Sequence, residues 1–136
     1  NKNFHRLSDG AKSRLTVEND DKPSLYSTKE LHDEVYLKIG IPVVHDFHHH
    51  TFCTGDIDQE EALLTAAMTW GDITPVTHYS ESRSVEQGDP KIRANAHSDF
   101  VLRKINTYGL DVDVMVEAKK KEQAVFKYLE LWGTGE

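Results

Sequence analysis

The feature that most constrains the fold of this chain is the alternation of short β-branched runs with helical segments at intervals of roughly 30 residues, the repeat of parallel βα units. Four strands are predicted because these runs carry the β-branched and aromatic side chains that strands favour. They cover 14–18, 41–47, 74–80 and 111–117. The residues that end the strands are separated by 28, 32 and 39 positions and are Glu18, Asp46, His78 and Glu117.

The segments between the strands carry helix signals. Ser27 and Glu30 form a capping box and Gly40 is a typical stop, which predicts a helix over 28–39. The next helix follows Asp56 or Asp58 as N-cap and has an acidic first turn. Its predicted apolar face consists of Leu63, Leu64, Ala67 and Met68. A polar loop is expected over 80–95, followed by helices over 97–108 and 118–132.

This order of elements predicts an α/β fold with four parallel βα units in one domain, 1–136. An eightfold (β/α)8 TIM barrel needs about 250 residues, so four units supply half of one. No linker rich in Pro, Gly or Ser divides the chain. The opening "NKNFHRLSDGAKSRL" has no methionine and resembles the middle of a helical segment, so we expect a fragment of a longer protein.

Composition excludes several classes of protein. The net charge of −7 provides no broad basic surface for a phosphate backbone, so any attraction to DNA must be local. The single cysteine, Cys53, permits no intrachain disulfide and no cysteine-rich zinc module. No apolar run approaches the roughly 20 residues of a membrane span, and no secretory signal is present. We therefore expect an intracellular protein that is not bound to a membrane.

Metal-ligand side chains end all four predicted strands. The carboxyl ends of parallel strands meet at one edge of a sheet, so Glu18, Asp46, His78 and Glu117 should converge. Carboxylates and imidazoles together bind divalent transition metals, and a carboxylate can bridge two ions roughly 4 Å apart. Glu18 or Glu117 could bridge in this way.

The run "DFHHH" adds further imidazoles to this edge. If the strand breaks after Asp46, a turn directs His49 toward the same pocket as Asp46, and His48 and His50 then point elsewhere. His97, which follows the long polar loop, is the natural sixth ligand.

The remaining histidines have structural interpretations. His45 alternates away from Asp46 along its strand and should pack beneath a helix, whereas His5 and His32 should lie on the surface.

Each ligand-type residue also has a structural interpretation. A strand-end carboxylate is often a helix cap, and a lone histidine such as His78 is more often a satisfied core residue. The run "EAKKKE" at the last helix start is most simply a solvated face. Four successive strand ends with ligand-type residues nevertheless favour a metal site over these separate explanations.

Several motifs resemble those of the UV-damage endonuclease family, in order: "LTVENDD", "GIPVVHDFHHH", "PVTHYSESRS", "HSDF" and "DVDVMVEAKKKE". They extend over nearly the whole chain and are similar to the C-terminal half of a family member. The family is related to the TIM barrels of endonuclease IV and xylose isomerase. The resemblance implies an enzyme that nicks double-stranded DNA immediately 5′ to UV photoproducts and uses a cluster of divalent ions, typically Mn²⁺, with Zn²⁺ or Mg²⁺ as alternatives.

The resemblance also implies roles for individual residues. Glu18 would bridge two ions, with Asp46, His78 and Glu117 around one of them, and His49 and His97 would bind a third ion. Many members carry a lysine two residues before the histidine of the third strand, whereas this chain has Val76 there. Any role of that lysine is therefore either absent from this chain or performed by a residue at another position.

Two other functions remain open from the sequence. A metal-dependent sugar isomerase or epimerase on the same type of barrel would also gather Glu, Asp and His at strand ends. Alternatively, the chain is an inactive half-barrel that pairs as a homodimer through its open sheet edges. A DNA repair enzyme would work in the cytoplasm, at the nucleoid, or in a eukaryotic nucleus.

Overall fold

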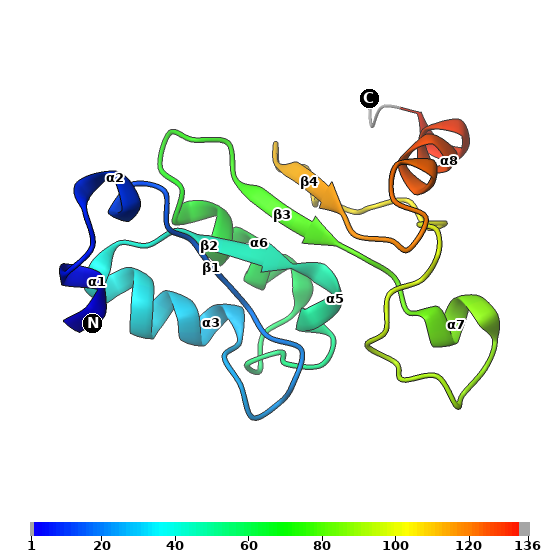
Figure 1. Ribbon diagram of the computed structural model, residues 1–136, viewed down its shortest axis with the longest axis horizontal. Helices are drawn as coiled ribbons and strands as arrows, with labels where there is room; N and C mark the ends of the chain where they lie inside the picture. Colours follow the sequence, from blue (N-terminus) through cyan, green and yellow to red (C-terminus); the bar gives the residue numbers. More distant parts are fainter. Residues whose placement is uncertain (1, 134–136) are drawn as a thin grey trace.

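The predicted α/β half-barrel is what the protein forms. The computed structural model describes residues 2–133. Four parallel strands make one sheet in the order β1 (Val17–Glu18), β2 (Val43–Asp46), β3 (Val76–Tyr79) and β4 (Asp113–Val116). Figure 1 shows β2 and β3 side by side, both directed toward the end of the molecule that carries α5 and α7.

The helices of the described residues are mostly short. They are α1 (Lys2–His5), α2 (Asp9–Lys12), α3 (Thr28–Leu31), a π-helical turn η1 (His32–Tyr36), α4 (Leu37–Ile39), α5 (Phe47–His50), α6 (Gln59–Met68), α7 (Arg83–Gln87) and α8 (Glu122–Trp132). Together α3, η1 and α4 form the helix predicted over 28–39. Ser27 accepts a hydrogen bond from the Glu30 amide at its start, and left-handed Gly40 ends it. Within residues 2–133, no helix has the length and apolar character that crossing a bilayer requires.

The core lies between β2 and the helices α3 and α6. Leu31, Val43 and Ala66 pack together and are almost fully buried. The apolar face predicted for α6 is wrong in part, because Leu64 and Met68 are exposed. Asp58 caps the helix, and the face that meets the sheet is formed by Ala62, Leu63 and Ala66. Small alanines on that face let the helix approach the strand closely.

Strand β1 is much shorter than the predicted 14–18. It lies at the edge of the sheet and pairs only with β2, matching Val17 to Val43 and Glu18 to Val44. Beyond Glu18 the backbone ladder stops, and the side chain of Asn19 takes its place by bonding both backbone groups of Asp46.

The prediction of a helix over 97–108 is wrong, because the structure has no helix there. A short helix, α7, lies in the segment over 80–95 that was predicted to be a loop. The backbone amides of Asp99 and Phe100 bond the carboxylate of Glu86, and those of Leu102 and Arg103 bond Glu81. Because these amides have side-chain acceptors, they are not available for a helical ladder. The last helix, α8, begins at Glu122 rather than at 118.

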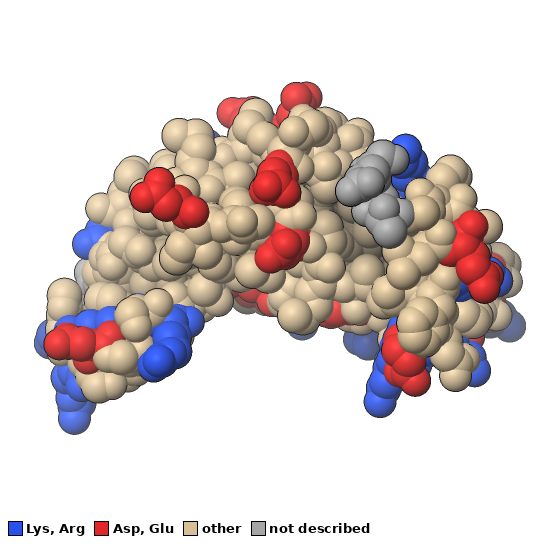
Figure 2. Space-filling model, turned by 90° about the horizontal axis from the view of Figure 1, so that it is seen from above, with Lys and Arg blue, Asp and Glu red and all other residues tan. Residues whose placement is uncertain are grey.

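The sheet register assigns the strand residues to two faces. His45 pairs with Thr77 and Asp46 with His78, so the first pair faces the covering helices and the second pair faces the opposite side. In space-filling view the molecule is arched, with a hollow between its two ends (Figure 2). An arched parallel sheet with helices on one face is the shape expected of half a barrel.

His45 packs beneath helices, as predicted. It is fully buried, and its two ring nitrogens contact the hydroxyl of Thr28 at the start of α3 and the amide oxygen of Gln59 at the start of α6. Burial lowers the pKa of His45 to about 4, although the hydrogen bond to Gln59 opposes this. A neutral imidazole therefore joins β2 to two helices.

Replacement of His45 by phenylalanine should lower the free energy of unfolding by about 2–4 kcal/mol, because Thr28 and Gln59 lose a buried partner. Chemical denaturation measures this change. His5→Phe, at an exposed position, is the control and should change the free energy by less than about 0.5 kcal/mol. Equal effects of the two substitutions would contradict this role of His45.

Candidate metal centre

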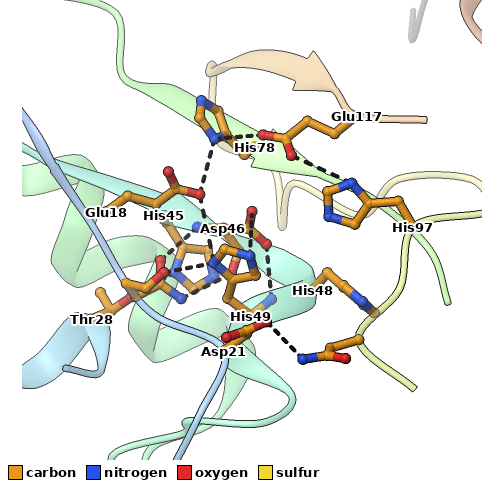
Figure 3. A network of polar contacts seen from close by, with 12 residues as sticks. Glu18, Asp21, Thr28, His45, Asp46, His48, His49, His78, His97 and Glu117 are labelled. Carbon is orange, nitrogen blue, oxygen red and sulfur yellow. Dashed lines mark hydrogen bonds and ion pairs between the residues drawn. The ribbon is translucent and has the colours of Figure 1, made fainter. Parts of the chain in front are cut away.

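The four strand-end residues predicted from sequence converge at one edge of the sheet. Ligand atoms of Glu18, Asp46, His78 and Glu117 all lie within 4.8 Å of one another, although up to 99 positions of sequence separate the residues. Figure 3 shows the four side chains directed toward a common space from β1, β2, β3 and the end of β4. These four residues could hold a metal ion.

His78 lies between the two outer carboxylates. Its Nδ1 is 3.0 Å from Oε1 of Glu18 and 2.9 Å from Oε1 of Glu117. The three side chains are partly exposed, at 19% for His78, 33% for Glu18 and 32% for Glu117. The centre is thus open to a ligand from one side.

Asp46 is the buried member of the group. One carboxylate oxygen accepts a hydrogen bond of 2.9 Å from the His49 amide and so caps α5, whereas the other is buried without any hydrogen-bond partner. Burial is the main cause that raises the pKa of Asp46, and nearby Glu18 raises it further. A buried carboxylate oxygen without a partner is costly, and a cation at this position would satisfy it.

His49 is oriented so that one ring nitrogen faces the cluster. Its Nδ1 donates a hydrogen bond of 2.7 Å to the carbonyl oxygen of Asn19, which can only accept. Nε2 is therefore the unprotonated nitrogen of the neutral ring, and it lies 3.7 Å from Oδ2 of Asp46. Burial lowers the pKa of His49, but the Asn19 carbonyl, Asp46 and Glu18 outweigh this effect and raise the pKa overall.

Asn19 is a residue of the centre that sequence reasoning missed. It is 1% exposed and bonds Asp46 through both its amide nitrogen, at 3.0 Å, and its amide oxygen, at 2.7 Å. Its own carbonyl holds His49. The sequence signal that could have identified Asn19 is its position directly after Glu18 in "VENDD". A polar side chain at the end of a buried strand needs hydrogen-bond partners nearby.

His97 reaches the centre from the long loop after β3. Its Nδ1 is 3.7 Å from Oε2 of Glu117. The sequence predicted that His97 opens a helix, and this is wrong. His97 forms an isolated antiparallel bridge with Ser82 instead. The neighbouring Asn95 bonds Asp21, and this contact ties the loop to the segment after β1. His97 is thereby close to the other candidate ligands without helical support.

The other polar residues near the centre point away from it. In Figure 3 the ring of His48 is directed toward the loop that carries His97, away from Asp46. His50 contacts the Ile57 carbonyl, and Cys53 is buried and contacts the carbonyl of Leu25. Val76 begins β3 on the same face as His78, so no ammonium group lies at that position.

The donor set suits divalent ions of the first transition row. Three carboxylates and three imidazoles lie at one rim, and oxygen and nitrogen donors together favour such ions over calcium. Glu117 approaches His78 through Oε1 at 2.9 Å and His97 through Oε2 at 3.7 Å. Glu18 approaches His78 at 3.0 Å and, at 3.7 Å, the Nδ1 of His49 that is bonded to Asn19. Glu117 thus presents one carboxylate oxygen to each of two imidazoles, an arrangement suited to a bridging carboxylate.

A family model described as UV-endonuclease UvdE matches residues 1–134, almost the whole chain. The chain belongs to the UvdE family. Among solved structures, one titled "Crystal Structure of SacUVDE" superposes with a TM-score of 0.78 at 27% identity, over 96% of this chain and 43% of the other.

Curated relatives occur in fungi and bacteria. The UV-damage endonuclease of Schizosaccharomyces pombe is 39% identical over 93% of this chain and 21% of its own length. The UV DNA damage endonuclease of Bacillus velezensis is 34% identical over 94% of this chain and 41% of its own length. The chain therefore spans between a fifth and two fifths of the length of these UvdE relatives.

Replacement of Glu18 by glutamine should lower the affinity for Mn²⁺ by at least about tenfold, because a neutral amide is a poorer ligand than a carboxylate. Titration calorimetry, or metal analysis after dialysis, measures this effect. His32→Gln serves as the control, since His32 lies on the helix over 28–39, outside the centre. Equal metal binding by the two variants would exclude Glu18 as a ligand.

Proposed function

We propose that this chain supplies half of the active site of a metal-dependent DNA repair endonuclease that nicks the strand immediately 5′ to UV photoproducts. The observation that supports this most strongly is the convergence of Glu18, Asp46, His78 and Glu117 at the carboxyl edge of the sheet. Endonuclease activity toward UV damage is the function named for the relatives in fungi and bacteria.

The residues proposed to hold the ions are Glu18, Asp46, His49, His78, His97 and Glu117. We favour Mn²⁺, with Zn²⁺ or Mg²⁺ as alternatives, because mixed imidazole and carboxylate donors suit Mn²⁺ and Zn²⁺ better than Mg²⁺. When bound, divalent ions would supply Lewis acidity at the scissile phosphate and neutralise charge that develops on the departing 3′ oxygen.

The chain's own residues would orient the donors for this chemistry. Glu18 and Glu117 would hold the ions from either side of His78, and Asp46 provides a buried carboxylate oxygen without a hydrogen-bond partner. Asn19 fixes the tautomer of His49 through its carbonyl and the position of Asp46 through its amide. Such contacts behind the ligands keep a site in its binding geometry before the ions arrive.

The proposed substrate is UV-damaged double-stranded DNA, despite the net charge of −7. Lys and Arg side chains, with Asp and Glu among them, lie at the two ends of the arch in Figure 2, on either side of the hollow. Divalent ions at the carboxylate cluster would reverse the sign of the potential where a phosphate must lie. Such an enzyme would act inside the cell, at the nucleoid or in a nucleus.

Membership of the UvdE family favours this function over that of a sugar isomerase or epimerase. The same four donors at strand ends would serve either reaction, so the geometry of the cluster alone does not separate them. Assay of sugar turnover beside DNA nicking makes the comparison directly.

Chelation should abolish nicking of UV-irradiated duplex, and added Mn²⁺ should restore it. The assay follows conversion of supercoiled to nicked plasmid, with a polypeptide of the relatives' length that contains this chain. Unirradiated plasmid is the control and should remain intact. Activity that persists in chelator, or sugar turnover without nicking, would refute the proposal.

A second candidate function is assembly of this chain alone with another copy. β1 and β4 are the edges of the sheet, and Met115 of β4 is 56% exposed on the face opposite the helices. Several apolar side chains of α8 are exposed as well, including Phe126 at 63%. Unpaired edges and exposed apolar residues both favour pairing of two half-barrels.

If two copies pair in this way, the isolated chain should elute as a dimer whose share increases with concentration. Size-exclusion chromatography with light scattering at several concentrations measures this. Met115→Lys should shift the equilibrium toward the monomer, whereas Met68→Lys, at an exposed position on α6, should not. A monomer at all concentrations would exclude this candidate.

A further inference from the structure

A cavity of about 480 Å³ adjoins the candidate metal centre at the end of β4. Two of the candidate ligands, His97 and Glu117, form part of its wall. The rest of the wall comes from the end of β4, the turn that follows it and the start of α8, and includes Lys119, Lys121 and Glu122. A ligand held at the metal centre can therefore extend into a space lined by lysines.

The two lysines belong to the run "EAKKKE", which by sequence alone is most simply interpreted as a solvated face. All three of its lysines, at 119, 120 and 121, are exposed, and none of them forms an ion pair with another residue in the range 2–133. The structure adds the position of the run, which begins directly at Glu117. Its ammonium groups are thus available to an anion that approaches the metal centre.

The backbone of residues 119–121, the lysine turn, is fixed to the loop that carries His97. The amide of Lys119 donates a hydrogen bond of 2.9 Å to the carbonyl oxygen of Ser98, and the amide of Lys120 donates one of 3.1 Å to that of Asp99. Ser98 is fully buried. The lysine turn and the candidate ligand His97 therefore keep a fixed position relative to each other.

Lys121 has a backbone conformation that glycine normally takes. Its φ is 50° and its ψ is −124°, and the carbonyl oxygen of Lys120 accepts a hydrogen bond of 3.0 Å from the amide of Gln123. These are the features of a type II′ turn with Lys121 at the first central position. Strained residues of this kind gather at functional sites. A lysine in place of glycine therefore indicates a role for its side chain.

The charge of the cavity depends on the metal centre. Besides His97, its ionisable residues are two lysines and two glutamates, so the opposite charges cancel when no ion is bound. One of the glutamates, Glu117, directs its two oxygens toward imidazoles of the centre. A divalent ion there would offset the charge of Glu117 and leave the cavity positive. The metal-loaded protein should therefore attract an anion to the lysine turn.

The anion that fits is a phosphate joined to one that already lies at the metal centre. We propose that Lys119 and Lys121 bind a backbone phosphate of the DNA strand, next to the phosphate held at the candidate ligands. This rests on the proposed function. Lysine binds phosphate as a point charge on a flexible stem, and such contacts position a strand without reading its sequence.

Binding of an unirradiated duplex to the Mn²⁺-loaded protein measures this contact without cleavage. The assay is fluorescence anisotropy at several salt concentrations, with a polypeptide of the relatives' length that contains this chain. Lys119→Gln combined with Lys121→Gln should weaken binding about tenfold and lower the slope of log affinity against log salt by about one. Chelation of Mn²⁺ should reduce the difference between the wild type and this double variant, because Glu117 then regains its charge.

The matched control is Lys12→Gln combined with Lys38→Gln. It removes two charges from α2 and α4, which precede β1 and β2 and so lie away from the strand ends that carry the candidate ligands (Figure 1). This control should bind the duplex like the wild type. Equal affinity and equal salt slope of the two double variants would overturn the proposal.

Lys121→Gly separates the role of the side chain from that of the turn. Glycine adopts a φ of 50° without strain, so the melting temperature should stay the same or rise. The affinity for DNA should nevertheless fall about threefold, because the ammonium group is lost. Wild-type affinity of Lys121→Gly would overturn the assignment of Lys121.

A neutral methylphosphonate locates the phosphate that is bound. In a duplex with one photoproduct, a methylphosphonate beside the scissile phosphate should lower kcat/KM of the wild type about tenfold on one side of the scissile bond. The lysine double variant should show no further loss with that duplex, because the contact is already absent. An equal loss in both proteins would overturn the position assigned to the phosphate. Absence of nicking by the wild type would refute the proposed function alone, because binding of the unirradiated duplex still measures the lysine contact.

Discussion

The parallel pairing of β2 with β3 is the interaction on which the rest of the site depends. It matches Asp46 to His78 and so directs both side chains to the face of the sheet that the helices leave free. Glu18 joins them because β1 pairs with the other edge of β2, and Glu117 joins them because it directly follows β4. A shift of one residue in the β2–β3 register would turn one of the two partners toward the helix layer.

Around this sheet, side chains repeatedly complete hydrogen bonding that the backbone ladder leaves unfinished. Asn19 continues the pairing of β1 with β2 after Glu18, and the carboxylate of Asp46 begins α5. Glu81 and Glu86 bind successive amides in the segment that connects β3 to β4. The helix of that segment is the short α7. The same two glutamates thus determine the path of the loop.

Sequence patterns predicted the elements whose signals are local. The capping box at Ser27 and the stop at Gly40 located the helix over 28–39, and alternation along β2 placed His45 beneath the helices. The failures have longer-range causes. The helix expected after His97 was lost to carboxylates ten or more residues away, and the buried face of α6 was decided by its approach to β2. Asn19 was missed because its partners, Asp46 and His49, lie 27 and 30 positions along the chain.

The sequence by itself determined the four βα units, the donors at the strand ends and the resemblance to UV-damage endonucleases, because strand period, helix caps and motif order are properties of neighbouring residues. Only the tertiary structure decided which atoms approach one another. It set the ring nitrogen of His49 that faces Asp46, brought His97 to Glu117 from a loop, and left one carboxylate oxygen of Asp46 buried without a hydrogen-bond partner. These features depend on contacts between segments far apart in sequence, which no local pattern specifies.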